Sequence, residues 1–231
     1  MSVNYQFLKE FKEIIDKHGE KLIKLYNISE IENTKDHALN PNVGVNRELD
    51  LVSFLHYFMK IKSVKYYFRN NYDYDVAING EYYSIKHQTG DSNSGIKIKW
   101  GTNMIDKYMN NIITFDYHMI IISINRENQA YKNNKTIKFY IIFADELNKV
   151  YMNLKTHKIK TFTTDSRGIS FSSEFMKNIK EASHKFILKS RLLKNIDDTE
   201  HALDFRLSIL QNMVLGKPIP HDKTKFTWIV N

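Results

Sequence analysis

Residues 72–90, YDYDVAINGEYYSIKHQTG, decide how the chain is expected to fold. Two runs rich in aromatic and β-branched residues flank Asn79-Gly80, and such runs are typical of β-strands. Asn-Gly is the dipeptide that most favours the two-residue turn of a β-hairpin, because both residues readily adopt a positive φ. The stretch therefore predicts two antiparallel strands joined by a tight turn.

The register of this hairpin predicts which of its polar side chains share a face. Residues directly opposite each other share a face, as do residues two apart on one strand. Asp75 is therefore expected opposite Ser84, and Asp73 opposite Lys86. Glu81, the hairpin's one glutamate, falls on the other face, although a bulge would reverse that assignment.

Two helices are expected before the hairpin. Apolar residues at helical spacing predict an amphipathic helix over residues 4–26, followed by a loop over residues 28–45. A second helix is expected from Asn46 to Lys60.

Glu48 lies on the expected inward face of that second helix, one turn before Val52. Burying a carboxylate alone is costly, so an inward Glu48 needs a cationic or metal partner. Alternatively, the first turn lies at the rim, and the acid there interacts favourably with the positive helix end. The sequence leaves both possibilities open.

The elements around and after the hairpin predict the fold class. Strands are expected over residues 64–68, 74–78, 81–88, 96–100, 118–124 and 137–143, with a short helix over residues 103–113. The first three form an antiparallel meander, and residues 96–100 are expected to extend it. The next two, HMIIISI and IKFYIIF, are nearly continuous apolar runs typical of strands buried on both faces. The helix between them and the meander is the crossover that parallel pairing requires. The prediction is an α/β fold with a mixed central sheet, an antiparallel meander plus a parallel strand, flanked by helices.

The last third of the chain is expected to be a helical elaboration. Helices are predicted over residues 144–152, 173–193 and 199–215, and a basic extended segment over residues 155–164. No linker, repeat or low-complexity tract interrupts the sequence. A single domain over residues 1–231 is therefore expected, with its core at about 46–143 and the elaboration at about 144–231.

Composition narrows the class of partner. The 34 Lys and Arg residues outnumber the 26 Asp and Glu residues and leave a net charge of +8, which favours a polyanionic partner such as nucleic acid. The alternative is that lysine is simply abundant here, as AT-rich genomes tend to encode. The absence of cysteine excludes disulfides and thiolate zinc sites. The charged N-terminal segment is unlike a signal peptide and no window resembles a membrane span, so a cytoplasmic protein is expected.

At this point the hairpin resembles the PD-(D/E)XK nuclease superfamily, which includes most type II restriction endonucleases. The pattern of that superfamily is an Asp at the start of one strand, and then an acidic residue, any residue and a Lys on the next strand. Asp75 followed by an apolar run, and later Ser84-Ile85-Lys86, is similar to it with two departures. Tyr74 stands where a Pro is frequent, and Ser84 stands where the second acid is expected. The resemblance covers about residues 46–143.

The resemblance implies Mg²⁺-dependent phosphodiester hydrolysis with one or two ions. It implies that Asp75 binds the metal together with the Ile85 carbonyl oxygen. A single carboxylate is a weak Mg²⁺ site, so a second acid is needed. Glu48 is the favoured candidate, because many family members carry a glutamate on a helix before the meander, and Asp73 is the other.

The same resemblance gives expected roles to three further hairpin residues. Lys86 would orient the attacking water, deprotonate it, or offset the phosphate charge, and the sequence does not separate these roles. Ser84 would support the site by hydrogen bonding. Gln88 lies on the same face by alternation and would hold a phosphate or a water molecule. The alternative is a surface hairpin whose Asp and Lys are incidental.

The expected function is a sequence-specific endonuclease acting on double-stranded DNA, in the setting of a type II restriction system. Such enzymes usually bind palindromes as homodimers, because the two-fold symmetry of the protein mirrors that of the site. Candidate DNA-binding residues lie on the hairpin, in the polar loop 90–95, on the following strand and in the basic segment: Gln88, Asn93, Lys97, Lys99, Lys155, Lys158, Lys160 and Arg167. The alternatives are a repair or transposition nuclease of the same fold, or a non-catalytic nucleic-acid-binding protein.

Overall fold

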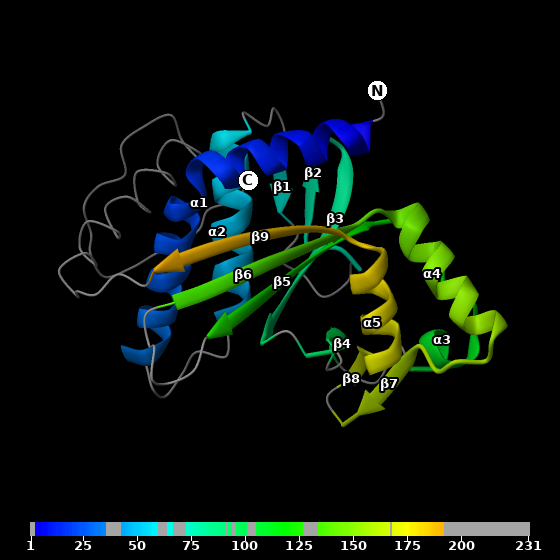
Figure 1. The fold of residues 1–231 in the computed structure, drawn as a ribbon. Helices are drawn as coiled ribbons and strands as arrows, with labels where there is room; N and C mark the ends of the chain where they lie inside the picture. The colour runs from blue at the N-terminus through cyan, green and yellow to red at the C-terminus, as the bar shows by residue number, and fades with distance from the viewer. Residues whose placement is uncertain are drawn as a thin grey trace.

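A six-stranded mixed sheet forms the centre of the molecule in the computed structural model, which describes residues 3–35, 43–59, 64–66, 73–90, 92–93, 96–100, 105–126, 134–166 and 168–191. The strand order is β1-β2-β3-β5-β6-β9 (Figure 1). The strands are β1 (Val64–Tyr66), β2 (Val76–Ile78), β3 (Glu81–Thr89), β5 (His118–Arg126), β6 (Asn134–Ile142) and β9 (His184–Arg191).

The predicted hairpin is confirmed as β2 and β3. Ile78 pairs with Glu81 across the turn, as the two-residue loop requires. Asn79 and Gly80 have φ values of 51° and 89°, the positive angles for which Asn-Gly is suited. β3 then pairs with β5 in parallel, which confirms the predicted crossover, and β6 continues the sheet antiparallel to β5.

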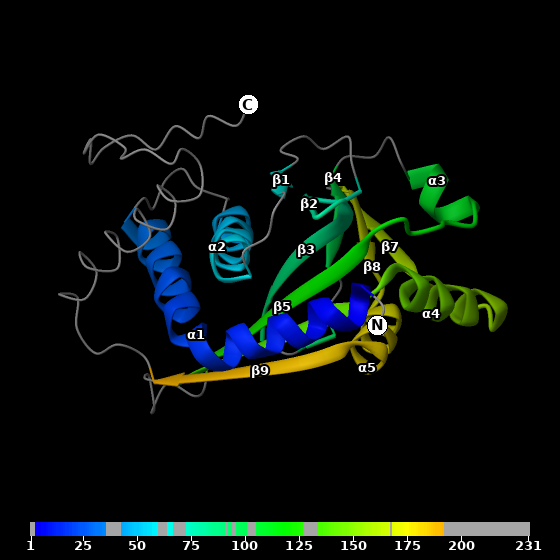
Figure 2. The ribbon, with the colours of Figure 1, turned by 90° about the horizontal axis from the view of Figure 1, so that it is seen from above.

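Helices cover both faces of the sheet (Figure 2). One face packs against α1 (Val3–Lys35) and α2 (Val43–Phe58), and the other against α4 (Ala144–Thr156) and α5 (Ser173–Ala182). Along β5, Ile120 and Ile122 face the first pair of helices, whereas Met119 and Ile121 face the second. Both faces of β5 are therefore buried, as its continuous apolar run predicts.

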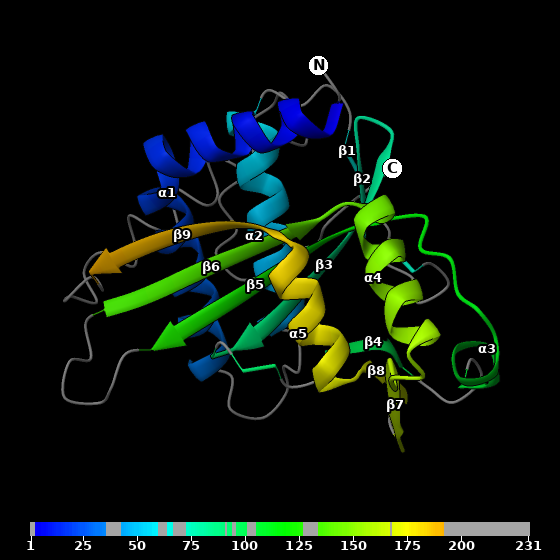
Figure 3. The same ribbon diagram turned by 45° about the vertical axis from the view of Figure 1, so that its right-hand side comes forward.

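A second, three-stranded sheet corrects the prediction for residues 96–100. This segment forms β4 (Lys97–Trp100), which does not extend the meander but pairs with β8 (Gly168–Phe171), next to β7 (Phe162–Asp165). Figure 3 shows this small sheet below α5. This segment joins the second sheet because its apolar side chains, Ile96 and Ile98, pack with the hydrophobic cluster on the face that α4 and α5 cover. The short helix α3 (Ile105–Asn110) lies within the predicted helix 103–113.

The predicted loop 28–45 and helix 173–193 also differ from the structure. α1 continues to Lys35, beyond the expected start of the loop, and α2 already begins at Val43. α5 ends at Ala182, where Ser183 turns extended, and the chain continues as strand β9. In β9 the partly buried Phe186 and Leu188 alternate with exposed residues, namely Lys185, Ile187 and Lys189, a period of two.

The elaboration predicted for residues 144–231 is therefore not simply helical. Its described part contains two helices and the strands β7, β8 and β9, of which β9 completes the main sheet. The predicted helix 199–215 lies outside the described residues. Within the described ranges, no helix combines the length and the apolar character needed to cross a membrane.

Candidate active site

The site lies where β2 and β3 separate. Their pairing runs from the turn to Val76 and Tyr83, and the N–H of Asp75 makes one further bond to the Tyr83 carbonyl, 2.9 Å long. Beyond that point the described part of β2 no longer covers the outer edge of β3. The Ser84-Ile85-Lys86 backbone is thus held on one side by β5 and faces Asp75 on the other.

Asp75 is the centre of the site, because three donors converge on its Oδ2. Lys86 Nζ donates over 2.9 Å, the backbone N–H of Ile85 over 2.7 Å and Ser84 Oγ over 3.2 Å. The predicted convergence of Asp75, Ser84 and Lys86 is therefore present. The departure at Ser84 has a structural meaning, because the side chain is buried and orients the carboxylate.

Lys86 is largely buried beside three carboxylates. Burial alone lowers the pKa of the amine, but Asp75 and the nearby acids outweigh that effect and raise the pKa above its ordinary value. The side chain is therefore a positively charged donor at neutral pH. Among the three acids, Asp75 raises the pKa of Lys86 most, and it forms an ion pair with Lys86.

Asp73 departs from its predicted place opposite Lys86. β2 begins only at Val76, so the strand alternation does not extend back to Asp73. Instead Tyr108 of α3 donates a 3.0 Å hydrogen bond to Asp73 Oδ1, and Lys107 Nζ lies 4.0 Å from Oδ2. Asp73 still lies close enough to contribute to the raised pKa of Lys86.

Glu48 approaches the same site from α2. Its side chain is half-buried, and its charge is among those that raise the pKa of Lys86. The two readings that the sequence leaves open, an acid that faces the site and an acid at the rim of the helix, both stay predictions. The charges of three acids, from α2 and from the segment before β2, act on Lys86, and one of these acids, Asp75, contacts it.

Gln88 lies on the predicted face but inside the molecule. Its Nε2 donates to the carbonyls of Gly90 (3.2 Å) and Ser92 (3.1 Å), and approaches Ser123 Oγ at 3.4 Å. Lys180 of α5 donates to the same Ser92 carbonyl over 2.8 Å. Gln88 therefore holds the loop that follows β3, and its predicted contact with DNA stays a prediction.

Glu81 lies apart from the site, as strand alternation predicts. Its carboxylate lies 3.3 Å from Nε2 of His118, whose Nδ1 accepts the N–H of Ala144 at the start of α4. Burial lowers the pKa of His118, and Glu81 opposes that shift without reversing it. This pair belongs to the end of the sheet from which α4 begins.

Comparison with known proteins places the chain in a family. The model of the family described as restriction endonuclease ThaI matches residues 8–199, most of the chain. The chain belongs to the ThaI restriction endonuclease family. The predicted function is confirmed at this level: the protein is a restriction endonuclease, a DNA hydrolase.

A solved structure supports the fold of this ThaI-family chain. It is titled "Restriction endonuclease in complex with substrate DNA", and it aligns with a TM-score of 0.62 and 20% identity over 88% of this chain and 98% of that one. At this identity the likeness shows the fold, which confirms the predicted restriction-endonuclease-like class. Among curated proteins, none matches the chain.

The donor atoms of the ThaI-family site are of the kind that Mg²⁺ prefers, namely hard oxygens. No described residue donates a hydrogen bond to the second carboxylate oxygen of Asp75, Oδ1. The Ile85 carbonyl faces the same edge as its N–H, since both groups of one strand residue point to the same side. Within the described ranges, no three His, Asp or Glu side chains already form a metal-binding group. The residues fit Mg²⁺ in chemical type, with Asp75 at the centre.

The predicted DNA-binding residues occupy several regions. Asn93 is exposed in the loop after β3, and Lys97 forms a 2.6 Å ion pair with Asp165 of β7. The lysines of the basic segment, by contrast, lie near the end of α4 and before β7: Lys155, Lys158 and Lys160. Arg167 and the side chain of Lys99 lie outside the described residues.

Sequence reasoning missed the contribution of α3. Tyr108 is buried, and burial and Asp73 together raise the pKa of its hydroxyl, which therefore stays a protonated donor. A predicted short helix after the meander was the available signal. Nothing in the pattern showed which face of that helix would meet Asp73.

Proposed function

We propose that this ThaI-family endonuclease hydrolyses phosphodiester bonds of double-stranded DNA at a specific, palindromic sequence, in a Mg²⁺-dependent reaction centred on Asp75 and Lys86. The observation that carries the proposal is the convergence of Lys86 Nζ, the Ile85 N–H and Ser84 Oγ on one oxygen of Asp75. It supports membership of the PD-(D/E)XK superfamily through a variant Asp…Ser-x-Lys motif.

Asp75 would hold Mg²⁺ together with Glu48 and the Ile85 carbonyl oxygen, with Asp73 as a further acid. When bound, the ion lowers the pKa of its water and offsets the charge that develops on the transferred phosphate. Ser84 and the Ile85 N–H fix the orientation of the Asp75 carboxylate. Because these donors occupy Oδ2, Oδ1 would be the oxygen available to the metal.

Lys86 acts as a charged donor beside the scissile phosphate. Its raised pKa keeps it protonated while it is paired with Asp75. A positioned ammonium group orients the attacking water by hydrogen bonding and stabilises developing negative charge. These two of the three predicted roles agree with the resting site, whereas deprotonation of water requires the pKa to fall first.

A palindromic target implies that two copies of the chain act together, so a homodimer is part of the proposal. The surplus of basic residues over the whole sequence supports DNA as the partner.

A plasmid cleavage assay with and without Mg²⁺ tests the proposal. Wild-type protein is expected to give discrete bands in Mg²⁺ and none in EDTA. Asp75→Ala and Lys86→Ala are expected to lose cleavage by at least about 10³-fold, because each removes a central element of the site. Two exposed residues away from the site serve as matched controls, Asp16→Ala and Lys149→Ala, and both are expected to cut normally.

Each other result points elsewhere. Normal cleavage by the Asp75 and Lys86 variants would show that the site assignment is wrong. Smeared products without discrete bands would favour a repair or transposition nuclease of the same fold. A gel shift by wild-type protein without cleavage in Mg²⁺ would identify a non-catalytic DNA-binding protein.

A further inference from the structure

Tyr74 stands where the nuclease pattern frequently has Pro, immediately before the central carboxylate of the site. Tyr74 and Asp75 both lie outside β2, which begins at Val76, so regular strand pairing does not hold them. One backbone bond continues past the paired residues, from the Asp75 N–H to the Tyr83 carbonyl. The position of Asp75 therefore depends on contacts made by the side chains around it.

Tyr74 stacks on Tyr82 of β3. The two ring centroids lie 4.2 Å apart, and the ring planes differ by 22°. Tyr74 is partly buried and packs against the hydrophobic cluster on the α4 and α5 face, whereas Tyr82 is 37% exposed. Paired aromatic rings attract each other beyond the burial of their surfaces, so this stack restrains the backbone that carries each ring.

The chain turns between Tyr74 and β2. Val76 and Ile78 pack on the α1 and α2 face, and a strand continued backward by two residues would place Tyr74 with them. Tyr74 instead packs with the cluster on the opposite face. Asp75 lies at this turn, and the stack fixes the side of the turn that β2 does not reach.

The side chains that hold this turn lie two apart along β3. Tyr82, Ser84 and Lys86 share one face of the strand by alternation. Ser84 and Lys86 donate to Asp75 Oδ2, and Tyr82 stacks on the residue before it. Three successive side chains on one face of β3 therefore contact the pair Tyr74-Asp75.

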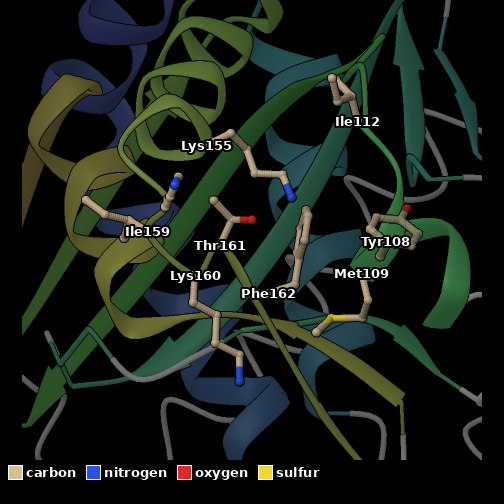
Figure 4. Close-up of a pocket in the computed structure, with 9 residues that line it drawn as sticks. Tyr108, Met109, Ile112, Lys155, Ile159, Lys160, Thr161 and Phe162 are labelled. Carbon is tan, nitrogen blue, oxygen red and sulfur yellow. The ribbon is translucent and has the colours of Figure 1, made fainter.

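Asp73, the residue before the stack, is held from α3. The hydroxyl of Tyr108 donates to Asp73, and the Tyr108 ring lines a pocket between α3, the end of α4 and the segment before β7 (Figure 4). Each of the residues 73–75 is thus held by a different contact. Of these contacts, the stack is the one that occupies no carboxylate oxygen, so it restrains the segment and leaves its acids to a metal ion.

We infer that Tyr74 and Tyr82 are positioning residues for Asp75, because their stack fixes the backbone that carries its carboxylate. This inference rests on the proposed function, in which Asp75 is the centre of the cleavage site. Proline restrains a backbone through its own fixed φ, whereas the stacked ring supplies a restraint from the neighbouring strand. The restraint needs the faces of the rings and not the phenol hydroxyls, so phenylalanine is expected to replace either tyrosine.

Hydrogen exchange of the Asp75 amide, followed by NMR without DNA or Mg²⁺, tests the restraint directly. Tyr82→Thr removes the ring but keeps a residue that favours strands. The Asp75 amide is expected to exchange about twofold to tenfold faster than in wild type, because local opening no longer breaks the stack. Tyr82→Phe should exchange at the wild-type rate. So should the control Tyr5→Ala, which removes a ring that is 56% exposed on α1.

Single-turnover cleavage at saturating DNA and Mg²⁺ tests the consequence for the reaction. Tyr74→Thr and Tyr82→Thr are each expected to lower the rate about tenfold, because a small misplacement of a catalytic group is costly. The affinity for DNA in EDTA should stay at the wild-type value. The variant with both substitutions should be no slower than the slower single variant, since the two rings act as one unit.

The inference is overturned if the Asp75 amide exchanges at the wild-type rate in Tyr82→Thr, or if the two rate losses multiply in the double variant. A loss of DNA affinity without a loss of rate would also overturn it and make Tyr82 a DNA contact. If wild-type protein cleaves plasmid while the exchange is unchanged, the inference alone fails. If wild-type protein cleaves no DNA, the proposed function fails, and the exchange rates still show whether the stack holds Asp75.

Discussion

Ser84 is the residue in which this site departs most clearly from the pattern it resembles. The side chain is buried and donates to the carboxylate of Asp75. In the proposed Mg²⁺ site, this position would therefore support a metal ligand and would not supply one. An enzyme built this way needs its second acid from outside the motif.

Ser84→Ala removes one of the three donors that orient Asp75. Hydrogen bonds to charged groups are typically worth about 1.5–3 kcal/mol, so we expect the cleavage rate to fall by roughly tenfold or more. Single-turnover cleavage at saturating Mg²⁺ measures this effect. A rate within twofold of wild type would show that the Ile85 N–H and Lys86 suffice to hold the carboxylate.

Glu48→Gln distinguishes the two candidate acids. Removing a ligand charge weakens a Mg²⁺ site, so half-maximal cleavage should require about 10- to 100-fold more Mg²⁺. Asp73→Asn is the matched comparison, and a smaller shift is expected because Tyr108 and Lys107 already engage that carboxylate. A larger shift for Asp73→Asn would make Asp73 the second metal-binding acid.

Among the elements, the hairpin could be predicted because its information is local. Asn79-Gly80 fixes the turn, the turn fixes the register, and the register places Ser84 and Lys86 on one face. Glu81 was correctly assigned to the other face on the same grounds. Asp73 was not, because alternation holds only within a strand and β2 starts at Val76.

The elements that were mispredicted depend on distant partners. β4 resembles a fourth meander strand in sequence, but Ile96 and Ile98 find their apolar partners across from α4 and α5. β9 was read as the continuation of a helix because its charges are frequent, and its role becomes visible only in its pairing with β6. Contacts between strands that lie this far apart in the sequence, such as Lys97 with Ser170 and Ile141 with His184, leave no local pattern.

A substitution of Ser172 tests how α5 is held in place. Ser172 caps the N-terminus of α5 and hydrogen-bonds to the segment before β7. Its Oγ accepts the N–H of Phe175 over 3.1 Å and donates to the Lys160 carbonyl over 2.6 Å. Ser172→Ala should lower the free energy of unfolding by about 1–2 kcal/mol, since a cap and a buried partner are lost together. Urea unfolding measures the change, with the exposed Ser173→Ala as control; equal stability of the two variants would contradict the capping role.

At the scale of the whole molecule, stability should depend on pH through the buried His118. Its folded pKa lies below the ordinary 6.5, with Glu81 and Asp145 opposing the effect of burial. Below about pH 6.5 the unfolded chain binds a proton that the folded chain resists, so stability falls as pH falls. His118→Asn retains an acceptor for the Ala144 N–H and does not titrate. Its melting temperature should fall less than that of wild type between pH 7.5 and 5.5, and an equal or steeper fall would contradict this assignment.

Because β5 is paired with a strand along both of its edges, different parts of the site should open at different rates. β5 pairs with seven residues of β3 on one side and eight of β6 on the other, whereas β2 pairs over only three residues with β3. Amide hydrogens of β5 should therefore exchange with deuterium only on global unfolding, and those of β2 through cheaper local opening. Asp75 would then lose and regain its contact with Lys86 many times before the whole sheet unfolds. The strand that keeps the rest of the sheet intact during these openings is β5, which carries none of the functional groups of the site.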